Sequence, residues 1–249
     1  MVFYSLKNND EIFVTNPFGF PTNFRIENYI NAWSRYNVPR YFINSLFVAF
    51  VTVLGTIILS VMFAYAAARL KWRLKDVARI YITLGMFIPV QVIMIPLAIL
   101  VRDLHLNNTY LSLIIPYIAF NLSFSTIVFY GFFRTIPYEL EESGYIDGAS
   151  IYYTFFYIIL PTIKPALATM IIFVFLSSWN EFTMALILIS KESLKTLPLG
   201  LLFFQGEFTT DWGAMGAAMT IASFPTILIY LLFSEQVENA LTVGSSVKG

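Results

Sequence analysis

The sequence lacks cysteine, contains a single histidine and is poor in charged residues. Charged side chains make up 12% of its 249 residues, against about 25% in a typical soluble domain. Without cysteine there is no disulfide framework, thiolate metal site or cysteine nucleophile. The formal net charge is zero, so no nucleic-acid-binding surface is indicated. We therefore predict no catalytic residue and no metal site.

Apolar residues fill the place of the missing charges, at 58% of the chain, with aromatic residues at 18%. A soluble protein of this composition would expose large apolar patches and associate, whereas lipid tolerates such a surface. A membrane-spanning helix needs about 20 mainly apolar residues. Five segments meet this condition: 41–68, 78–101, 109–133, 166–190 and 214–233. The sequence predicts an all-α, multi-pass membrane helix bundle forming one transmembrane domain over residues 1–249.

The distribution of lysine and arginine predicts the orientation, because cytoplasmic loops are rich in both. The segment after the first span contains Arg69, Lys71, Arg73, Lys75 and Arg79. The next short loop contains only Arg102, so we place it outside. Alternation then puts 134–165 inside, 191–213 outside and the tail 234–249 inside. Residues 1–40 would lie outside with no span before them. We expect that a first helix precedes this chain in the whole protein; the alternative is unaided translocation of the tail.

Two further patterns limit the function. No G-x-x-x-x-G-K-[ST] motif occurs, so the chain has no phosphate-binding loop of that kind. A membrane-embedded enzyme would need a cluster of histidine and acidic residues at one membrane depth, and the sequence has no such cluster. Pro89 and Pro96 bracket Gln91 in the second span and predict a kink there, which is either structural or a hinge.

The connection 134–165 is the most informative segment, since about 32 residues far exceed a tight helix–helix turn. Pro137 suits the first turn of a helix, and Glu139, Glu141 and Glu142 follow where the positive end of the helix dipole favours acids. Apolar residues then recur at helical spacing, a pattern that predicts one helix face: Ile146, Ala149, Tyr153 and Phe156.

Gly148 interrupts this pattern and permits a bend, and Leu160-Pro161 is expected to break the helix before the next span. We predict two short helices that meet at Gly148 and lie at the membrane surface. Their apolar edge would be available to a partner.

The spacing of this loop resembles the EAA loop of ABC-importer permeases. It reads Glu142-Ser143-Gly144, three residues, Gly148, nine residues, Ile158, one residue, Leu160-Pro161. Ser143 and Gly144 replace the two alanines of the family pattern. Other segments are similar to the maltose-type sugar permeases, a family whose pattern starts one helix earlier. They include NPFGFPTNFRIENYINAW (16–33), MFIPVQVIMIPL (86–97), SSWNEFTMALIL (177–188) and LTVGSSVKG (241–249).

This resemblance implies a non-enzymatic permease subunit that carries a carbohydrate across a bacterial-type cytoplasmic membrane. It implies four kinds of partner besides membrane lipid: a second homologous permease, a cytoplasmic ATPase dimer, an extracytoplasmic solute-binding protein and the sugar. ATP and magnesium would bind the ATPase, leaving this chain without a cofactor. The resemblance assigns ATPase coupling to Glu141, Glu142, Ser143, Gly144, Asp147, Gly148, Ala149, Ile158, Leu160 and Pro161.

Several residues keep more than one interpretation. Glu142 and Asp147 could form a partner-docking surface, a solvated face or a catalytic pair. Polar residues within the spans could line the substrate pathway or form structural hydrogen bonds: Gln91, Asn121, Trp179, Asn180 and Glu181. An ion-coupled secondary transporter is the alternative function, although such proteins usually show inverted repeats and intramembrane ion sites.

Overall fold

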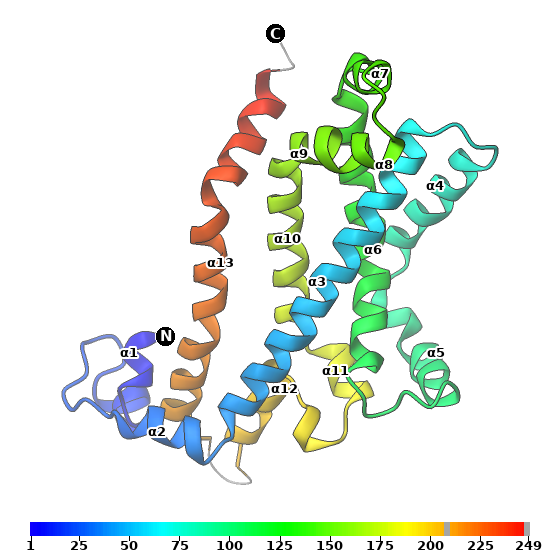
Figure 1. Cartoon of the computed structure of the whole chain (residues 1–249). Helices are drawn as coiled ribbons and strands as arrows, with labels where there is room; N and C mark the ends of the chain where they lie inside the picture. Colours follow the sequence, from blue (N-terminus) through cyan, green and yellow to red (C-terminus); the bar gives the residue numbers. More distant parts are fainter. Residues whose placement is uncertain (207–209, 247–249) are drawn as a thin grey trace. The chain divides into compact units, whose positions relative to one another are not determined.

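A computed structural model describes the backbone of residues 1–206 and 210–246, with side chains up to residue 233. Every regular element in this part of the chain is helical (Figure 1). Three helices are long and apolar enough to cross a membrane: α3 (Val38–Arg69), α6 (Leu111–Thr135) and the Trp212–Phe233 part of α13 (Trp212–Ser246). If each of two bent helix pairs is counted as one span, the candidate spans number five, which is the predicted number.

The first bent pair joins α4 (Lys75–Leu84) and η2 (Gly85–Phe87) to α5 (Val90–Asp103), with an angle of 105° between its halves. Ile88, directly before Pro89, has extended backbone angles, because the proline ring disfavours the helical region for the residue before it. Pro96 stays within α5. The predicted kink is confirmed, and it lies at Pro89.

The second bent pair corrects the predicted end of the loop. It joins α8 (Ile151–Tyr153), η3 (Thr154–Ile159) and α9 (Leu160–Thr162) to α10 (Lys164–Trp179) at 76°. Leu160 and Pro161 do not break the helix, because they form the start of α9. In the first turn of a helix the missing N–H of proline costs no hydrogen bond. The break falls at Ile163, which lies between α9 and α10.

The fourth span is also shorter than predicted. We expected it to run over 166–190, with Glu181 near its middle, but α10 ends at Trp179. The Glu181 carboxylate accepts hydrogen bonds from the backbone N–H groups of Met184 (2.7 Å) and Ala185 (3.1 Å). It thereby starts a separate helix, α11 (Thr183–Leu188), because an acidic side chain satisfies N–H groups that have no partner within the helix.

The short helices complete the element order. They are α1 (Val2–Ser5), η1 (Glu11–Thr15), α2 (Glu27–Ser34), α7 (Glu139–Ile146), η4 (Glu192–Leu194), α12 (Leu197–Gly200) and η5 (Leu201–Phe204). The prediction of one shared helix face was wrong for four residues of the loop: Ile146, Ala149, Tyr153 and Phe156. Instead α7 ends at Ile146 and α8 begins at Ile151.

The chain divides into two compact units, each built from three separate stretches. The first comprises Met1–Ala49, Pro96–Leu113 and Ser178–Ile229; the second comprises Phe50–Ile95, Ile114–Ser177 and Tyr230–Gly249. The segments predicted to lie outside (1–40, the Arg102 loop and 191–213) belong to the first unit. The Lys- and Arg-rich segment and the loop 134–165, both predicted to be cytoplasmic, belong to the second.

In the first unit, buried polar side chains organise the N-terminal segment. The Lys7 ammonium donates to the backbone oxygens of Asn16 (2.6 Å) and Gly19 (2.8 Å). The Glu11 carboxylate accepts from both the backbone N–H (2.7 Å) and the hydroxyl (3.0 Å) of Thr22. These bonds satisfy the buried charged groups and give residues 7–22 a defined path.

In the second unit, the apolar core joins the loop to the spanning helices. Tyr65 of α3 contacts Phe133 of α6 and Phe155 of η3, with ring centroids 5.6 and 4.7 Å apart. Further buried members are Val61, Ala64, Ala68, Phe129, Ile159, Ile163, Ala166, Met170 and Val174. The C-terminal half of the loop is thus fixed by burial of its side chains among α3, α6 and α10.

Candidate coupling loop and transport pathway

The turn between α7 and α8 explains why a glycine is needed at position 148. Gly148 has φ of +81°, a conformation that costs other L-residues energy. Its N–H donates to the Tyr145 carbonyl (3.1 Å), and the Ala149 N–H donates to the Gly144 carbonyl (2.9 Å). These two bonds form a Schellman motif, which satisfies the last carbonyls of α7. The predicted meeting of two short helices at Gly148 is confirmed.

Ser150 starts the second of the two helices. Its hydroxyl accepts a hydrogen bond from the Tyr153 backbone N–H (3.2 Å), the usual N-cap arrangement. α7 packs against η3, and Gly144 faces the side chains of Ile158 and Thr154. A Cβ at Gly144 would lie 2.8 Å from the Ile158 Cδ1 atom. The glycine that replaces alanine in the family pattern therefore permits a close approach between the two helical segments.

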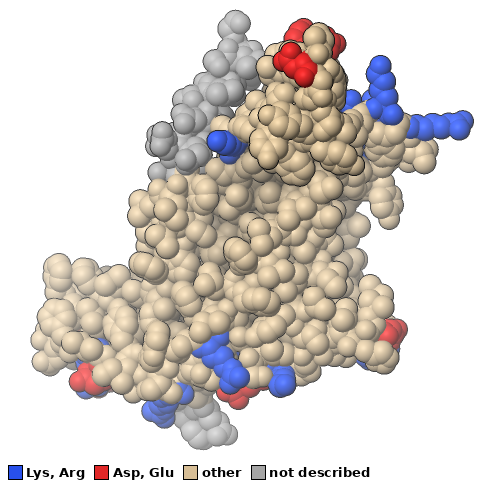
Figure 2. Space-filling view, in the orientation of Figure 1, with Lys and Arg blue, Asp and Glu red and all other residues tan. Residues whose placement is uncertain are grey.

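The predicted coupling residues fall into three groups by exposure. Glu141 and Gly144 are buried, whereas Ala149, Ile158 and Leu160 are half-buried. The exposed group is Glu142, Ser143, Asp147, Gly148 and Pro161. Figure 2 shows acidic side chains gathered over α7. Only the exposed group is directly available to another protein chain.

Beside the acidic residues lies an exposed apolar and aromatic edge. Ile146 is 85% exposed, and Tyr152, Tyr153, Phe156 and Tyr157 are exposed as well. The rings of Tyr153 and Tyr157 stack with centroids 4.8 Å apart. Because large exposed apolar patches mark interaction surfaces, we take these acidic and aromatic groups as a candidate docking surface. We define the docking surface as Glu142, Asp147, Ile146, Tyr152 and Tyr157.

Glu141 points away from this surface. Its Oε1 atom lies 3.1 Å from Nε of Arg69, at the end of α3. Burial raises the pKa of the Glu141 carboxyl, and the Arg69 charge acts in the opposite direction. Sequence reasoning treated Arg69 only as a topology signal and missed this pair. An arginine directly following the apolar run AYAAA was the available signal.

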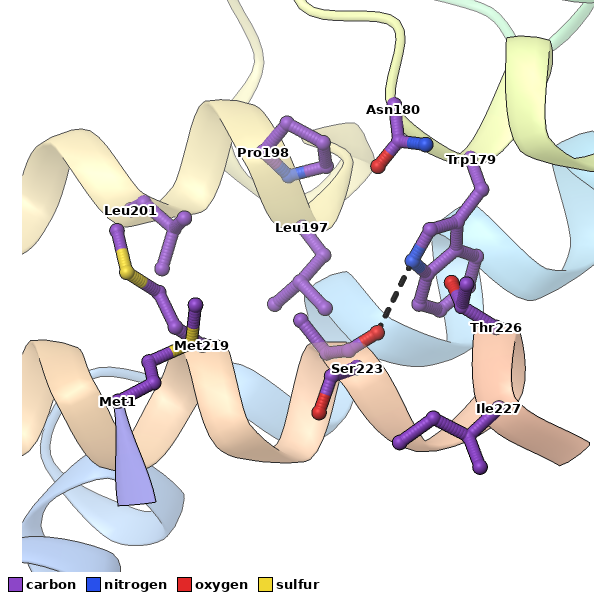
Figure 3. A pocket seen from close by; sticks show the side chains of 11 residues that line it. Met1, Trp179, Asn180, Leu197, Pro198, Leu201, Met219, Ser223, Thr226 and Ile227 are labelled. Atoms are coloured by element: carbon purple, nitrogen blue, oxygen red, sulfur yellow. Dashed lines mark hydrogen bonds between the residues drawn. The ribbon is translucent and has the colours of Figure 1, made fainter. Parts of the chain in front are cut away.

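A cavity of about 360 Å³ in the first unit contains two of the predicted pathway residues, Trp179 and Asn180. Trp179 is 3% exposed, and its indole N–H donates to the Ala222 carbonyl (3.1 Å), shown dashed in Figure 3. Its ring meets Phe42 edge to face, with centroids 5.4 Å apart. Asn180, Ser223 and Thr226 bring polar groups to a wall that is otherwise largely apolar.

The remaining predicted pathway residues lie elsewhere. Glu181 caps α11 and is not among the residues lining that cavity. Gln91 and Asn121 belong to the second unit, Gln91 exposed on α5 and Asn121 buried on α6. The Asn121 amide donates to the Tyr117 carbonyl (2.8 Å). This bond along α6 supports the structural interpretation of Asn121.

No group of three or more histidine and acidic residues that could hold a metal ion occurs within the described residues. The geometry defines a polytopic helical membrane protein that presents a two-helix loop between its third and fourth spans. Residues 56–243 match the family model described as "Binding-protein-dependent transport system inner membrane component". The chain belongs to this family.

Curated relatives match along nearly the whole chain. The probable ABC transporter permease protein YurM of Bacillus subtilis is 36% identical, covering 100% of this chain and 82% of that protein. The diacetylchitobiose uptake system permease protein NgcG of Streptomyces coelicolor is 32% identical, with 97% and 80% covered. The trehalose/maltose transport system permease protein MalG of Thermococcus litoralis is 33% identical, with 88% and 80% covered.

A solved structure confirms the fold. It is a chain from the crystal structure of a bacterial ABC transporter involved in the import of the acidic polysaccharide alginate. Its TM-score is 0.81 at 23% identity, and the match covers 94% of this chain and 87% of that one. The family model and the curated relatives confirm the predicted permease family, and the alternative of an ion-coupled secondary transporter does not fit them.

Proposed function

We propose that this chain is a permease subunit of an ATP-driven importer that carries a carbohydrate across the cytoplasmic membrane. The observation that carries the proposal is the docking surface on a loop of the family's EAA spacing, in a chain without a phosphate-binding loop. A sugar is the proposed substrate because relatives such as NgcG and MalG are named as uptake proteins for diacetylchitobiose and for trehalose and maltose.

The docking surface binds a groove of a cytoplasmic ATPase, which holds ATP and magnesium. Exposed acids suit basic groups on the partner, and the aromatic edge supplies apolar contact area. A second permease completes the pathway, and a solute-binding protein delivers the sugar. Closure of the ATPase dimer moves the loop, and rigid helices carry this motion into the membrane.

The sugar passes beside the cavity at Trp179 and Asn180. Carbohydrate hydroxyls need several hydrogen-bonding groups, and the cavity offers the Asn180 amide with the Ser223 and Thr226 hydroxyls. Gln91, which is exposed, remains a candidate on a separate segment. Asn121 and Glu181 are weaker candidates, because the side chain of each makes a structural hydrogen bond to nearby backbone.

The test is reconstitution of the complete complex in proteoliposomes, with uptake of a panel of labelled sugars. We expect uptake of at least one sugar that requires both ATP and the solute-binding protein. Glu142→Lys should uncouple ATP hydrolysis from uptake, because it reverses a charge on the docking surface. Asp103→Lys, a charge reversal at an exposed acid of the first unit, is the matched control. Uptake that is driven by an ion gradient without ATP would contradict the proposal.

A further inference from the structure

The end of α3 and the start of α7 are joined by a buried charged contact. The Arg69 side chain is 0% exposed and the Glu141 side chain 9% exposed, with Nε and Oε1 3.1 Å apart. A second guanidinium nitrogen of Arg69, Nη2, donates to the Ile136 carbonyl (2.5 Å). The guanidinium carbon lies 4.2 Å from the centre of the Tyr138 ring, and the Tyr138 hydroxyl donates to the Ala68 carbonyl (3.5 Å).

These contacts differ from the other ion pairs among the described residues. Asp76–Arg79 and Arg102–Asp103 join residues close in sequence, and their side chains are substantially exposed, so they contribute little. Arg69 instead contacts Ile136, Tyr138 and Glu141, the segment that enters α7. The Arg69–Glu141 contact is an ion pair without a hydrogen bond, since neither Nε nor Oε1 has a hydrogen-bond partner. The directional contacts of the planar guanidinium are its hydrogen bond to the Ile136 carbonyl and its position over the Tyr138 ring, and these hold the orientation of the two helices.

We propose that Arg69 is a positioning residue that transmits displacement of α7 to α3 during transport. The inference rests on the proposed function, since the displacement comes from an ATPase bound at the docking surface. Motion of α7 reaches the membrane because Arg69 prevents it from sliding along the end of α3. Apolar packing is non-directional, so the packing of α7 against η3 does not by itself fix the orientation of α7 against α3.

A purely structural role makes a different prediction. Removing one member of a buried ion pair leaves the other charge buried and uncompensated, whereas replacing both with apolar residues of similar volume is often neutral or stabilising. A pair that only stabilises the fold can therefore be replaced as a whole without loss of function. A pair that positions α7 cannot be replaced in this way, because the directional contacts are lost even when the chain folds.

The experiment compares Arg69→Met, Glu141→Leu, the double variant Arg69→Met/Glu141→Leu and the conservative Arg69→Lys in the reconstituted complex. Two quantities are measured: the amount of assembled complex and the sugar transported per ATP hydrolysed. We expect the single variants to assemble poorly and the double variant to assemble like the wild type. We expect the double variant to transport at least about fivefold less sugar per ATP, within the usual range of coupling between sites. Arg69→Lys should restore part of the coupling.

Arg102→Met is the matched control, because Arg102 is exposed and the same substitution there should change neither quantity. A double variant that assembles and transports with wild-type coupling would overturn the positioning role. So would a double variant whose loss of transport follows only from a smaller amount of complex. Failure of the proposed function is distinguishable, since the wild-type complex itself would then show no ATP-dependent sugar uptake.

Discussion

Replacing Gly148 tests whether the turn between α7 and α8 is limited by backbone conformation or by space. At φ of +81°, a Cβ on this residue would meet no atom within 4 Å. The cost of Gly148→Ala is therefore conformational and should be about 1–2 kcal/mol. In a chain of this size each kcal/mol lowers the unfolding temperature by about 2–4 °C, so we expect a decrease of several degrees.

Two further variants make the reasoning specific. Gly148→Asn should be destabilised less than Gly148→Ala, because asparagine tolerates the left-handed region better. Gly131→Ala is the matched control: Gly131 also has open space around it, but it lies inside α6. There alanine should stabilise the helix by roughly 0.5–1 kcal/mol.

The assay is thermal unfolding of the purified chain in detergent, followed by sugar transported per ATP in the complex. Because the strain lies at the turn that sets the angle between α7 and α8, Gly148→Ala should also weaken coupling, and Gly131→Ala should not. Shifts of the same sign at Gly148 and Gly131, or an asparagine no better tolerated than alanine at 148, would refute the conformational explanation.

Three other predictions concern the first unit. The pKa of Glu11 is lowered, chiefly by the hydrogen bond from the Thr22 backbone. Stability from this group is therefore present above the unfolded pKa and lost as the pH falls through the folded value. Glu11→Gln should flatten the dependence of the unfolding temperature on pH below the unfolded glutamate pKa of about 4.3. Glu181→Ala removes the cap of α11 and should lower the free energy of unfolding by about 0.5–2 kcal/mol. Thermal unfolding should show a smaller loss for Glu181→Gln, and equal losses for the two variants would contradict the capping role. Gly200→Ala places a Cβ 2.2 Å from the Tyr41 ring and should lower the free energy of unfolding by about 1–3 kcal/mol. In a double-mutant cycle, Tyr41→Leu should relieve part of this loss, and simply additive losses would argue against the clash.

Much of the fold was predictable because lipid imposes strong local rules. Spanning segments must be long and apolar, since backbone groups can be satisfied there only within helices, so 41–68 and 109–133 were recognisable as spans. The bend at Pro89 and the turn at Gly148 follow from the sterics of single residues. The ATPase-coupling assignment came from the EAA spacing, a pattern fixed by sequence distance alone.

The errors arose where one polar side chain or one turn decided the outcome. The apolar run after Trp179 is compatible with a continuous span, yet the Glu181 carboxylate begins a new helix by bonding to N–H groups a few residues ahead. The spacing of Ile146, Ala149, Tyr153 and Phe156 fits a helix, but the Schellman turn at Gly148 ends α7 first. Hydrophobic periodicity carries no information on such competition between local hydrogen bonds.

By itself, the sequence determined the class of this protein, its five candidate spans and the two-helix loop between the third and fourth of them, because each depends on local composition or on fixed spacing. Only the tertiary structure decided that Glu141 turns inward to Arg69 while Glu142 stays exposed, and that Trp179 and Asn180 share a cavity without Glu181. The physical reason is that burial and pairing depend on chain segments far apart in sequence, so neighbouring residues of the same type can face opposite environments.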